Sequence, residues 1–184
     1  FSSMTLREPY RLTLPVSDRD HYQGSSIAKV TLVEYGDYQC PRSWAAQQII
    51  PLIQQQLGEQ IRFVFRHFPR SSLHPEAFHA AEAAEAAAAQ NKFWEMHSYL
   101  FHNPSNLADS YLVRYAIALC LNVDQFLAEM TSDRHMARVQ ADIESGVQSG
   151  VIETPTFFIN GLKYGDDTSL ETLLEAVVNA ERNC

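Results

Sequence analysis

The chain has 184 residues, with 14 Lys and Arg against 22 Asp and Glu, so its formal net charge is −8. This negative charge argues against a nucleic acid or an anionic membrane surface as a partner. The composition, 46% apolar and 20% charged, is that of a folded globular protein rather than a disordered chain. The length suits one domain with a sizeable core. No apolar run reaches the ~20 residues of a membrane-spanning helix, so we expect no membrane insertion.

The first part of the chain is polar and irregular. Residues 1–29 are interrupted by Pro9, Pro15 and Gly24, and we expect them to form an N-terminal arm laid over a single domain at residues 30–184. No basic segment followed by an apolar stretch and a cleavage site occurs here. We therefore expect a cytoplasmic protein, and a periplasmic or otherwise exported location stays open if a signal peptide has been removed.

A strand–helix–strand unit follows the arm. Residues 30–35 (VTLVEY) have the β-branched and aromatic composition of a buried strand. Pro41 can open a helix, and an apolar stripe at helical spacing continues to Leu57 before Gly58 ends it. Residues 61–66 (IRFVFR) predict a second strand. Two strands joined by such a helix pair in parallel.

A block of helices comes next and interrupts the strands. Its Ala- and Glu-rich and apolar-periodic stretches predict an all-helical insertion at about residues 75–149. Its helices are expected over residues 75–89, 93–101, 109–121, 123–131 and 134–149.

The chain returns to strands after this block. Residues 156–159 (TFFI) and 162–164 predict two strands, joined at Asn160-Gly161, which is a strong hairpin signal. Residues 169–180 predict an amphipathic helix. The whole order predicts an α/β fold with a mixed four-stranded central sheet.

The three cysteines are odd in number and widely spaced, which excludes a disulfide scaffold. Cys40, followed by Pro41, Arg42 and Ser43, lies where the first strand gives way to a helix. Unpaired N–H groups and the helix dipole at such a place favour the thiolate, and Arg42 adds a cation. Because thiolate is the nucleophilic form, the sequence predicts a reactive Cys40. The alternative is a small apolar residue that plugs the loop.

The other two cysteines are weaker candidates. Cys120 falls in the apolar stripe of the helix expected at residues 109–121, and we expect it to be a buried core residue. Cys184 ends the chain in polar surroundings. A role for either thiol in resolving a mixed disulfide at Cys40 stays open.

Thr154 and Pro155 precede the third predicted strand. A proline at a strand start can make a rigid bend if its peptide bond is cis. From the residues alone an ordinary trans turn is favoured.

Several separated segments together resemble the DsbA-like family of thioredoxin-fold thiol-disulfide oxidoreductases. The segments are VEYGDYQCP, VFRHFP, HPEAFHAAEAAEAA, KFWEMH and ETPTFFING. The resemblance covers residues 30–178 and implies a thioredoxin fold with a helical insertion. It implies that Cys40 is the nucleophile and that Pro155 is a cis-proline facing it, with Thr154 before it. The segment PVSDRDHYQG also resembles the lead-in of DsbA-like domains found alone or fused behind sodium/proton antiporters.

The resemblance fails at Ser43, where the family's motif has a second cysteine. That second thiol attacks the mixed disulfide formed by the first, and a serine hydroxyl can only form hydrogen bonds. A dithiol cycle at Cys40 is therefore excluded, and a one-thiol cycle completed by an external thiol such as glutathione remains. An engineered replacement of a native cysteine at this position stays open.

Two carboxylates lie near the motif in the sequence. Glu34 matches the family's buried acid and is a possible proton acceptor, a role that Ser43 puts in doubt. The alternative is a strand-end carboxylate satisfied by the helical block. Asp37 we expect to be a solvated loop carboxylate, because a buried anion there would oppose the thiolate.

Trp44 is expected mainly as a packing residue that could form one wall of a substrate groove. The seven histidines do not share the i, i+4 spacing of a zinc helix motif, so we expect no metal. We expect His67 to make a structural hydrogen bond.

The sequence therefore favours an enzyme: a DsbA-like, single-thiol oxidoreductase acting on protein or peptide thiols and disulfides, with no cofactor other than an external thiol as co-substrate. Thr154 and Pro155 would align an extended substrate strand. One alternative is a binding module that keeps the groove without catalysis. The other is a glutathione transferase or isomerase relative, against which the presence of Cys40 counts. Oligomeric state is not indicated.

Overall fold

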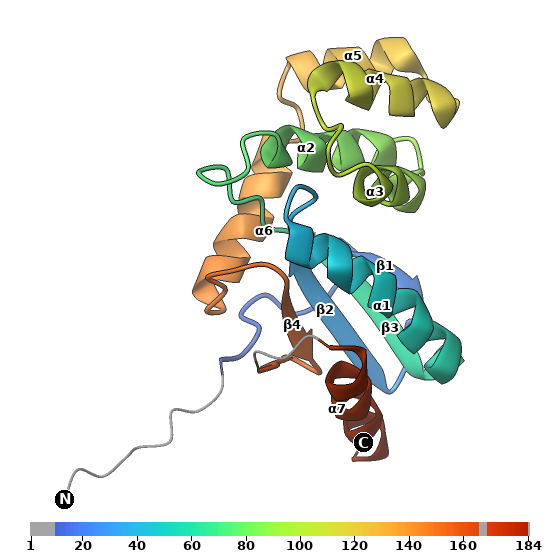
Figure 1. Cartoon of the computed structure of the whole chain (residues 1–184), viewed down its shortest axis with the longest axis vertical. Helices are drawn as coiled ribbons and strands as arrows, with labels where there is room; N and C mark the ends of the chain where they lie inside the picture. Colours follow the sequence, from blue (N-terminus) through green and yellow to red (C-terminus); the bar gives the residue numbers. More distant parts are fainter. Residues whose placement is uncertain (1–9, 166–168, 184) are drawn as a thin grey trace, which may run out of the picture.

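The computed structural model describes residues 10–165 and 169–183. Within these residues one mixed sheet has the strand order β1-β3-β2-β4-β5 (Figure 1). The strands are β1 (His21–Gly24), β2 (Val30–Gly36), β3 (Ile61–His67), β4 (Thr156–Ile159) and β5 (Leu162–Lys163). The helices are α1 (Pro41–Leu57), α2 (Ala77–Ala88), α3 (Phe93–His102), α4 (Asp109–Ala118), α5 (Val123–Thr131), α6 (Met136–Gln148) and α7 (Leu170–Arg182), with a short 3₁₀ turn, η1 (Gly58–Gln60), after α1.

The centre of the sheet is the predicted parallel pair. β2 and β3 run parallel from Val30 opposite Ile61 to Gly36 opposite His67, with α1 as their connection. β4 pairs antiparallel with β2, and β5 pairs antiparallel with β4. The expected thioredoxin-type arrangement is confirmed.

The expectation of four strands was wrong by one strand. β1 lies inside the expected arm and pairs antiparallel with β3 at the edge of the sheet. Its four residues alternate between intermediate and exposed positions, so it lacks the apolar run that marks a central strand. The rest of the described arm does lie over the domain: the Leu12 N–H donates to the Gly161 carbonyl over 2.8 Å. The part of the arm at residues 1–9 lies outside the described residues.

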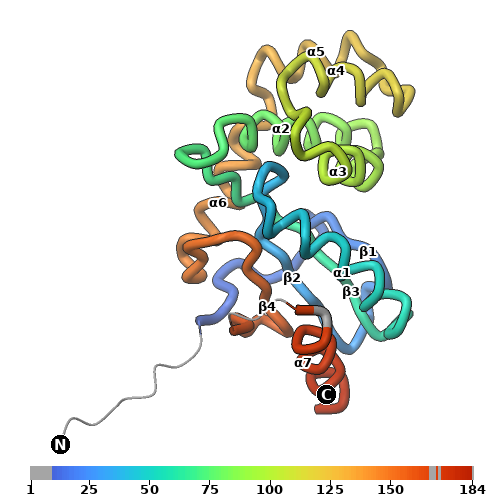
Figure 2. Tube along the Cα trace, viewed as in Figure 1, coloured from blue at the N-terminus to red at the C-terminus, as the bar shows by residue number. Residues whose placement is uncertain are grey.

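The helices form two groups. α1 and α7 cover one face of the sheet, α2 to α5 stack beyond one end of it, and α6 runs from this block back to contact β3 (Figure 1). The trace in Figure 2 leaves the sheet after β3 and returns to it at β4, so this block is the predicted insertion. No helix in the described part of the chain is both long and apolar enough to span a membrane.

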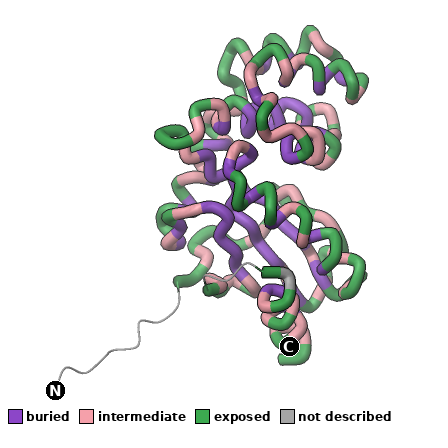
Figure 3. Tube along the Cα trace, in the orientation of Figure 1, coloured by how far each residue is buried: buried purple, intermediate pink, exposed green. Residues whose placement is uncertain are grey.

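Alternating strand residues supply two cores. Leu32 and Phe63 belong to the larger core, which also contains residues of α1 and α7 and extends into the insertion. Val33, Tyr35 and Phe158 belong to a smaller core on the other face. Buried segments therefore run through the middle of the sheet and through the centre of the insertion (Figure 3).

The helices of the insertion start and stop close to their predicted positions, except that α4 ends before its predicted C-terminus. α4 ends at Ala118, so Cys120 lies beyond the helix with a φ of 58° and is exposed. The expectation of a buried core cysteine was therefore wrong. The apolar stripe stops one turn early because the chain reverses here through a left-handed residue at the helix end.

A close contact between α6 and the sheet gives a first prediction. A Cβ atom at Gly146 would lie 2.8 Å from the ring of Phe68 and 3.1 Å from the ring of Tyr35. Both rings are buried, so we expect Gly146→Ala to lower the free energy of unfolding by about 1–2 kcal/mol, despite the better helix propensity of alanine. Urea unfolding measures this, with Gln140→Ala on the exposed side of α6 as the control, expected within about 0.5 kcal/mol of the parent. A stabilised Gly146→Ala protein would contradict the close packing.

Candidate active site

Cys40 occupies the boundary predicted for it. It is the N-cap residue of α1, with a φ of −80° and a ψ of 122°, and Pro41 is the first residue of the helix. Because Cys40 is at the N-terminus of α1, the positive end of the helix dipole is directed at it, and no side chain of the described residues caps the helix. The side chain is largely buried, with 7% of the residue exposed.

Thr154 and Pro155 lie next to Cys40 in the structure, although Thr154 is 114 positions away in the sequence. The Cys40 thiol donates to the Thr154 carbonyl oxygen over 3.5 Å. The Thr154–Pro155 peptide bond is cis, whereas the residues alone favoured trans. The Thr154 hydroxyl is buried and has no hydrogen-bond partner within the described part of the protein. The pair thus forms the wall that faces the sulfur, as the resemblance implies.

Arg42 is not placed as expected. Its guanidinium pairs with the carboxylate of Glu153, with 3.3 Å between Nη1 and Oε2, and both side chains are about half exposed. An exposed pair of this kind contributes little stability, but it offsets the charge that was expected beside Cys40. The N-terminus of α1 is therefore the main positive electrostatic feature directed at Cys40.

Ser43 is turned into the protein. It is fully buried, and its hydroxyl oxygen accepts a hydrogen bond from the Asp37 N–H over 3.2 Å. The side chain therefore helps to hold the loop that carries Cys40, and it cannot reach a substrate at the surface.

Asp37 corrects a sequence-based expectation. It is only 1% exposed, whereas a solvated carboxylate was expected. One carboxylate oxygen accepts from the Gln39 N–H over 2.7 Å, and the other accepts from the Arg70 N–H over 2.9 Å and the His74 ring over 2.7 Å. The carboxylate thus ties the Cys40 loop to the segment that leads into the insertion. The sequence signal was the turn GDYQ, where Asp side chains commonly accept from backbone N–H groups two residues on.

Glu34 is buried without a partner. The residue is 0% exposed, and neither carboxylate oxygen has a hydrogen bond within the described part of the protein. Burial raises the pKa of Glu34 from 4.5 to about 8. The interpretation in which the helical block satisfies this carboxylate is wrong. Its neighbours in the sheet are Phe65 and Phe157, so the group is protonated at neutral pH, and its role as a proton acceptor stays a prediction.

The surface beside Cys40 and Pro155 is partly apolar. Trp44, in the first turn of α1, is 40% exposed, and Ile152, two residues before Thr154, is 75% exposed. A shallow recess of about 50 Å³ includes Ile152 and Pro155 in its lining, but not Trp44. The packing role expected for Trp44 is therefore only partial, and its exposed face is free to contact a substrate.

The histidines serve structural contacts. His67 donates through Nε2 to a carboxylate oxygen of Glu85 over 2.9 Å, which confirms its predicted structural hydrogen bond, and His21 reaches the same oxygen over 2.6 Å. These bonds lower the pKa of Glu85 against the opposing effect of burial. Within residues 10–165 and 169–183, no group of three or more His, Cys, Asp or Glu side chains is arranged to hold a metal ion.

No second thiol is placed beside Cys40 among the described residues. Cys120 lies at the end of α4 in the insertion, and Cys184 lies outside the described residues. Among the described residues Cys40 therefore has no neighbouring thiol.

Comparison with known proteins gives a consistent result. Residues 17–179 match the family model described as Thioredoxin. The chain is 41% identical over 172 residues to the Na(+)/H(+) antiporter NhaA 3 of Salinispora tropica, which covers 92% of this chain and 26% of that protein. The chain thus spans about a quarter of the length of the curated relatives it matches.

Solved structures with low sequence identity share the fold. BdbD from Bacillus subtilis matches with a TM-score of 0.81 at 20% identity, covering 95% of this chain and 98% of that one. Alpha-DsbA1 from Wolbachia pipientis matches with a TM-score of 0.79 at 21% identity, covering 94% and 95%. The helical insertion and the sheet therefore follow the DsbA-type arrangement.

Proposed function

This chain belongs to the thioredoxin family, and on that basis we propose that it is a thiol-disulfide oxidoreductase that works through the single thiol of Cys40. Its substrates are disulfides of proteins or peptides. The observation that carries the proposal is the pairing of a Cys40 thiol at the start of α1 with a fully buried serine at position 43.

The chemistry is an exchange in two steps. The Cys40 thiolate attacks one sulfur of a substrate disulfide, forming a new disulfide with that half and releasing the other half as a thiolate. An external thiolate then attacks the substrate sulfur of the mixed disulfide, and the Cys40 thiolate leaves. Each step makes one S–S bond and breaks one, so no further oxidant is needed. Isomerisation and the removal or transfer of glutathione are reactions of this type.

The segment opposite Cys40, at Thr154 and Pro155, aligns the substrate. The Thr154 backbone faces the sulfur, and an extended peptide at this position can pair with it as an added strand. Trp44 and Ile152 offer exposed apolar contacts on either side. The exchange works in either compartment: glutathione is the natural external thiol in the cytoplasm, and a reduced partner protein takes its place in an exported location.

The test compares how long a glutathione adduct on Cys40 persists in two protein variants. Cys120 is exposed, so Cys120→Ser and Cys184→Ser are first introduced to leave Cys40 as the one reactive thiol. This protein is incubated with oxidised glutathione, and peptide mass mapping follows the adduct. We expect glutathione on Cys40, persisting until reduced glutathione is added.

The matched variant in this background is Ser43→Cys. Its introduced thiol attacks the Cys40 sulfur, forms an internal disulfide and releases reduced glutathione, so the adduct should be at least about tenfold shorter-lived. Equal adduct lifetimes in the two proteins, or no adduct on Cys40, would overturn the single-thiol proposal.

One observation favours a second candidate, a peptide-binding module. The Cys40 thiol is largely buried and already donates to Thr154, and Arg42 is engaged by Glu153. If Cys40→Ser keeps the same bound partners while the parent turns over no disulfide with any thiol, the binding module is the better description.

A further inference from the structure

A second cavity lies far from Cys40, in the helical insertion. It has a volume of about 390 Å³ and is formed by α2, α4, α5 and the residue Asp133 just after α5. This volume is within the range of small-molecule sites. Cys40 is not among its lining residues, so what binds here is independent of the proposed exchange reaction.

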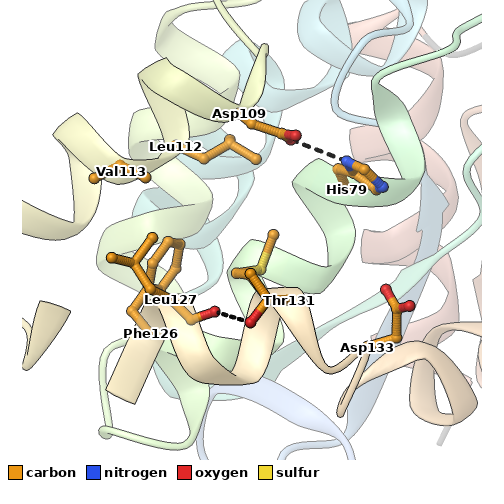
Figure 4. Close-up of a pocket in the computed structure, with 9 residues that line it drawn as sticks. His79, Asp109, Leu112, Val113, Phe126, Leu127, Thr131 and Asp133 are labelled. Carbon is orange, nitrogen blue, oxygen red and sulfur yellow. Dashed lines mark hydrogen bonds and ion pairs between the residues drawn. The ribbon is translucent and has the colours of Figure 1, made fainter. Parts of the chain in front are cut away.

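The cavity has an apolar side that reaches the core of the insertion. Leu112 of α4 and Phe126 of α5 line it, and both are almost fully buried, while Leu127 beside them is 39% exposed. Figure 4 shows these side chains gathered on one side of the cavity. An occupant must therefore extend into the protein, which suits a small molecule with an apolar body rather than a flat protein surface.

The opposite side is polar and acidic. His79 and Asp133 lie there in Figure 4, with Asp109 joined to His79 across 2.9 Å. The hydrogen bond with Asp109 raises the pKa of His79, so this pair is largely self-neutralising at its exposed edge.

Asp133 has a different environment. Burial and the nearby Asp133 charge raise the pKa of Glu82. Within the described residues neither is paired with a Lys or Arg side chain, and the neighbouring Arg134 reaches Glu129 instead, at 3.4 Å.

We propose that this cavity binds a small organic cation, with an apolar ring or branched chain against Leu112 and Phe126 and a primary ammonium group at Asp133. The ammonium donates to the Asp133 carboxylate, which is paired with no Lys or Arg side chain of the described residues, while the His79 ring is held by Asp109. The apolar part covers the exposed side chain of Leu127, since Leu112 and Phe126 are already shielded from water. A neutral analogue keeps only the apolar part, and an anionic analogue is repelled by Asp133.

Three small phenyl compounds that differ in the charge of their polar group test the proposed binding site in the full chain. Phenethylamine, 2-phenylethanol and 3-phenylpropionate are titrated into isotope-labelled protein and followed by amide NMR shifts. For a fragment of this size we expect millimolar affinity for the amine, with shifts centred on α4 and α5. The alcohol should bind about tenfold more weakly, and the carboxylate should not bind.

Two substitutions test whether the charge of Asp133 causes the preference for the amine. Asp133 has a φ of 52°, a conformation that asparagine also tolerates, so Asp133→Asn keeps the backbone and removes the charge. It should abolish the preference for the amine over the alcohol. Asp124→Asn removes an equal charge from an exposed position on α5 outside the cavity and should leave that preference intact.

The proposal is overturned if the three probes bind equally, if no probe shifts the cavity residues, or if Asp124→Asn acts as strongly as Asp133→Asn.

Discussion

Replacing Glu34 with Gln should remove a large pH-dependent loss of stability. Burial raises the pKa of Glu34 to about 8 in the folded protein, while the unfolded chain titrates near 4.5. The group costs no stability below pH 4.5, and stability is lost progressively as the pH rises toward 8, because only the unfolded state releases the proton readily. Between pH 5 and pH 8.5 the parent should lose about 4 kcal/mol relative to Glu34→Gln.

Urea unfolding of both proteins at the two pH values measures this difference. Groups common to both proteins, including the histidines, cancel in the comparison. Glu34→Leu is the second variant, since it also removes the unpaired oxygens from the apolar core, and at pH 8.5 it should be stabilised like Glu34→Gln. A parallel pH dependence of parent and Glu34→Gln would mean that the carboxyl is charged or solvated in the folded state.

Asp37→Ala should have the next largest effect. The substitution leaves the Gln39 and Arg70 N–H groups and the His74 ring without their acceptor. Each of these partly buried donors, left unsatisfied, costs about 1–3 kcal/mol, so we expect a total loss of roughly 3–5 kcal/mol in the free energy of unfolding. Urea unfolding measures this at neutral pH.

A second readout separates the local effect from general destabilisation. Because Asp37 holds the loop before α1, its removal should also speed alkylation of Cys40 by iodoacetamide relative to alkylation of the exposed Cys120 in the same molecule. The control is His74→Gln, whose amide can still donate to Asp37 and which should cost about 1 kcal/mol or less. A loss below about 1 kcal/mol in Asp37→Ala, or an unchanged ratio of alkylation rates, would show that this carboxylate does not hold the loop.

Burial alone does not determine whether a carboxyl group near Cys40 is hydrogen-bonded or left without a partner. Asp37 and Glu34 are three residues apart and equally hidden from water. Asp37 has hydrogen-bond donors from the Cys40 loop and from the segment before the insertion, whereas Glu34 lies among aromatic neighbours with no donor. The first can therefore hold the Cys40 loop through its hydrogen bonds, whereas the second stays protonated at neutral pH.

Much of the fold follows from local sequence. Apolar periodicity and breaker residues predicted the helices of the insertion, and α5 was predicted at its observed bounds. The β-branched run before Cys40 and Pro41 after it placed the cysteine at the start of a helix. These features depend on residues within one or two turns of each other, so the amino-acid order is enough to determine them.

The partners of the site residues were decided only by the tertiary structure. Arg42 binds Glu153 and Asp37 binds Arg70 and His74, and no local pattern links residues so far apart in the chain. Strand β1 forms only by pairing with β3 at the sheet edge, and Cys120 is exposed because α4 ends at Ala118 and the chain reverses at Cys120. The sequence by itself determined that Cys40 stands at a helix start, with a serine at position 43 in place of a second cysteine. The packing of distant segments decided which charges surround it, because burial and pairing are properties of contacts between segments that no local pattern encodes.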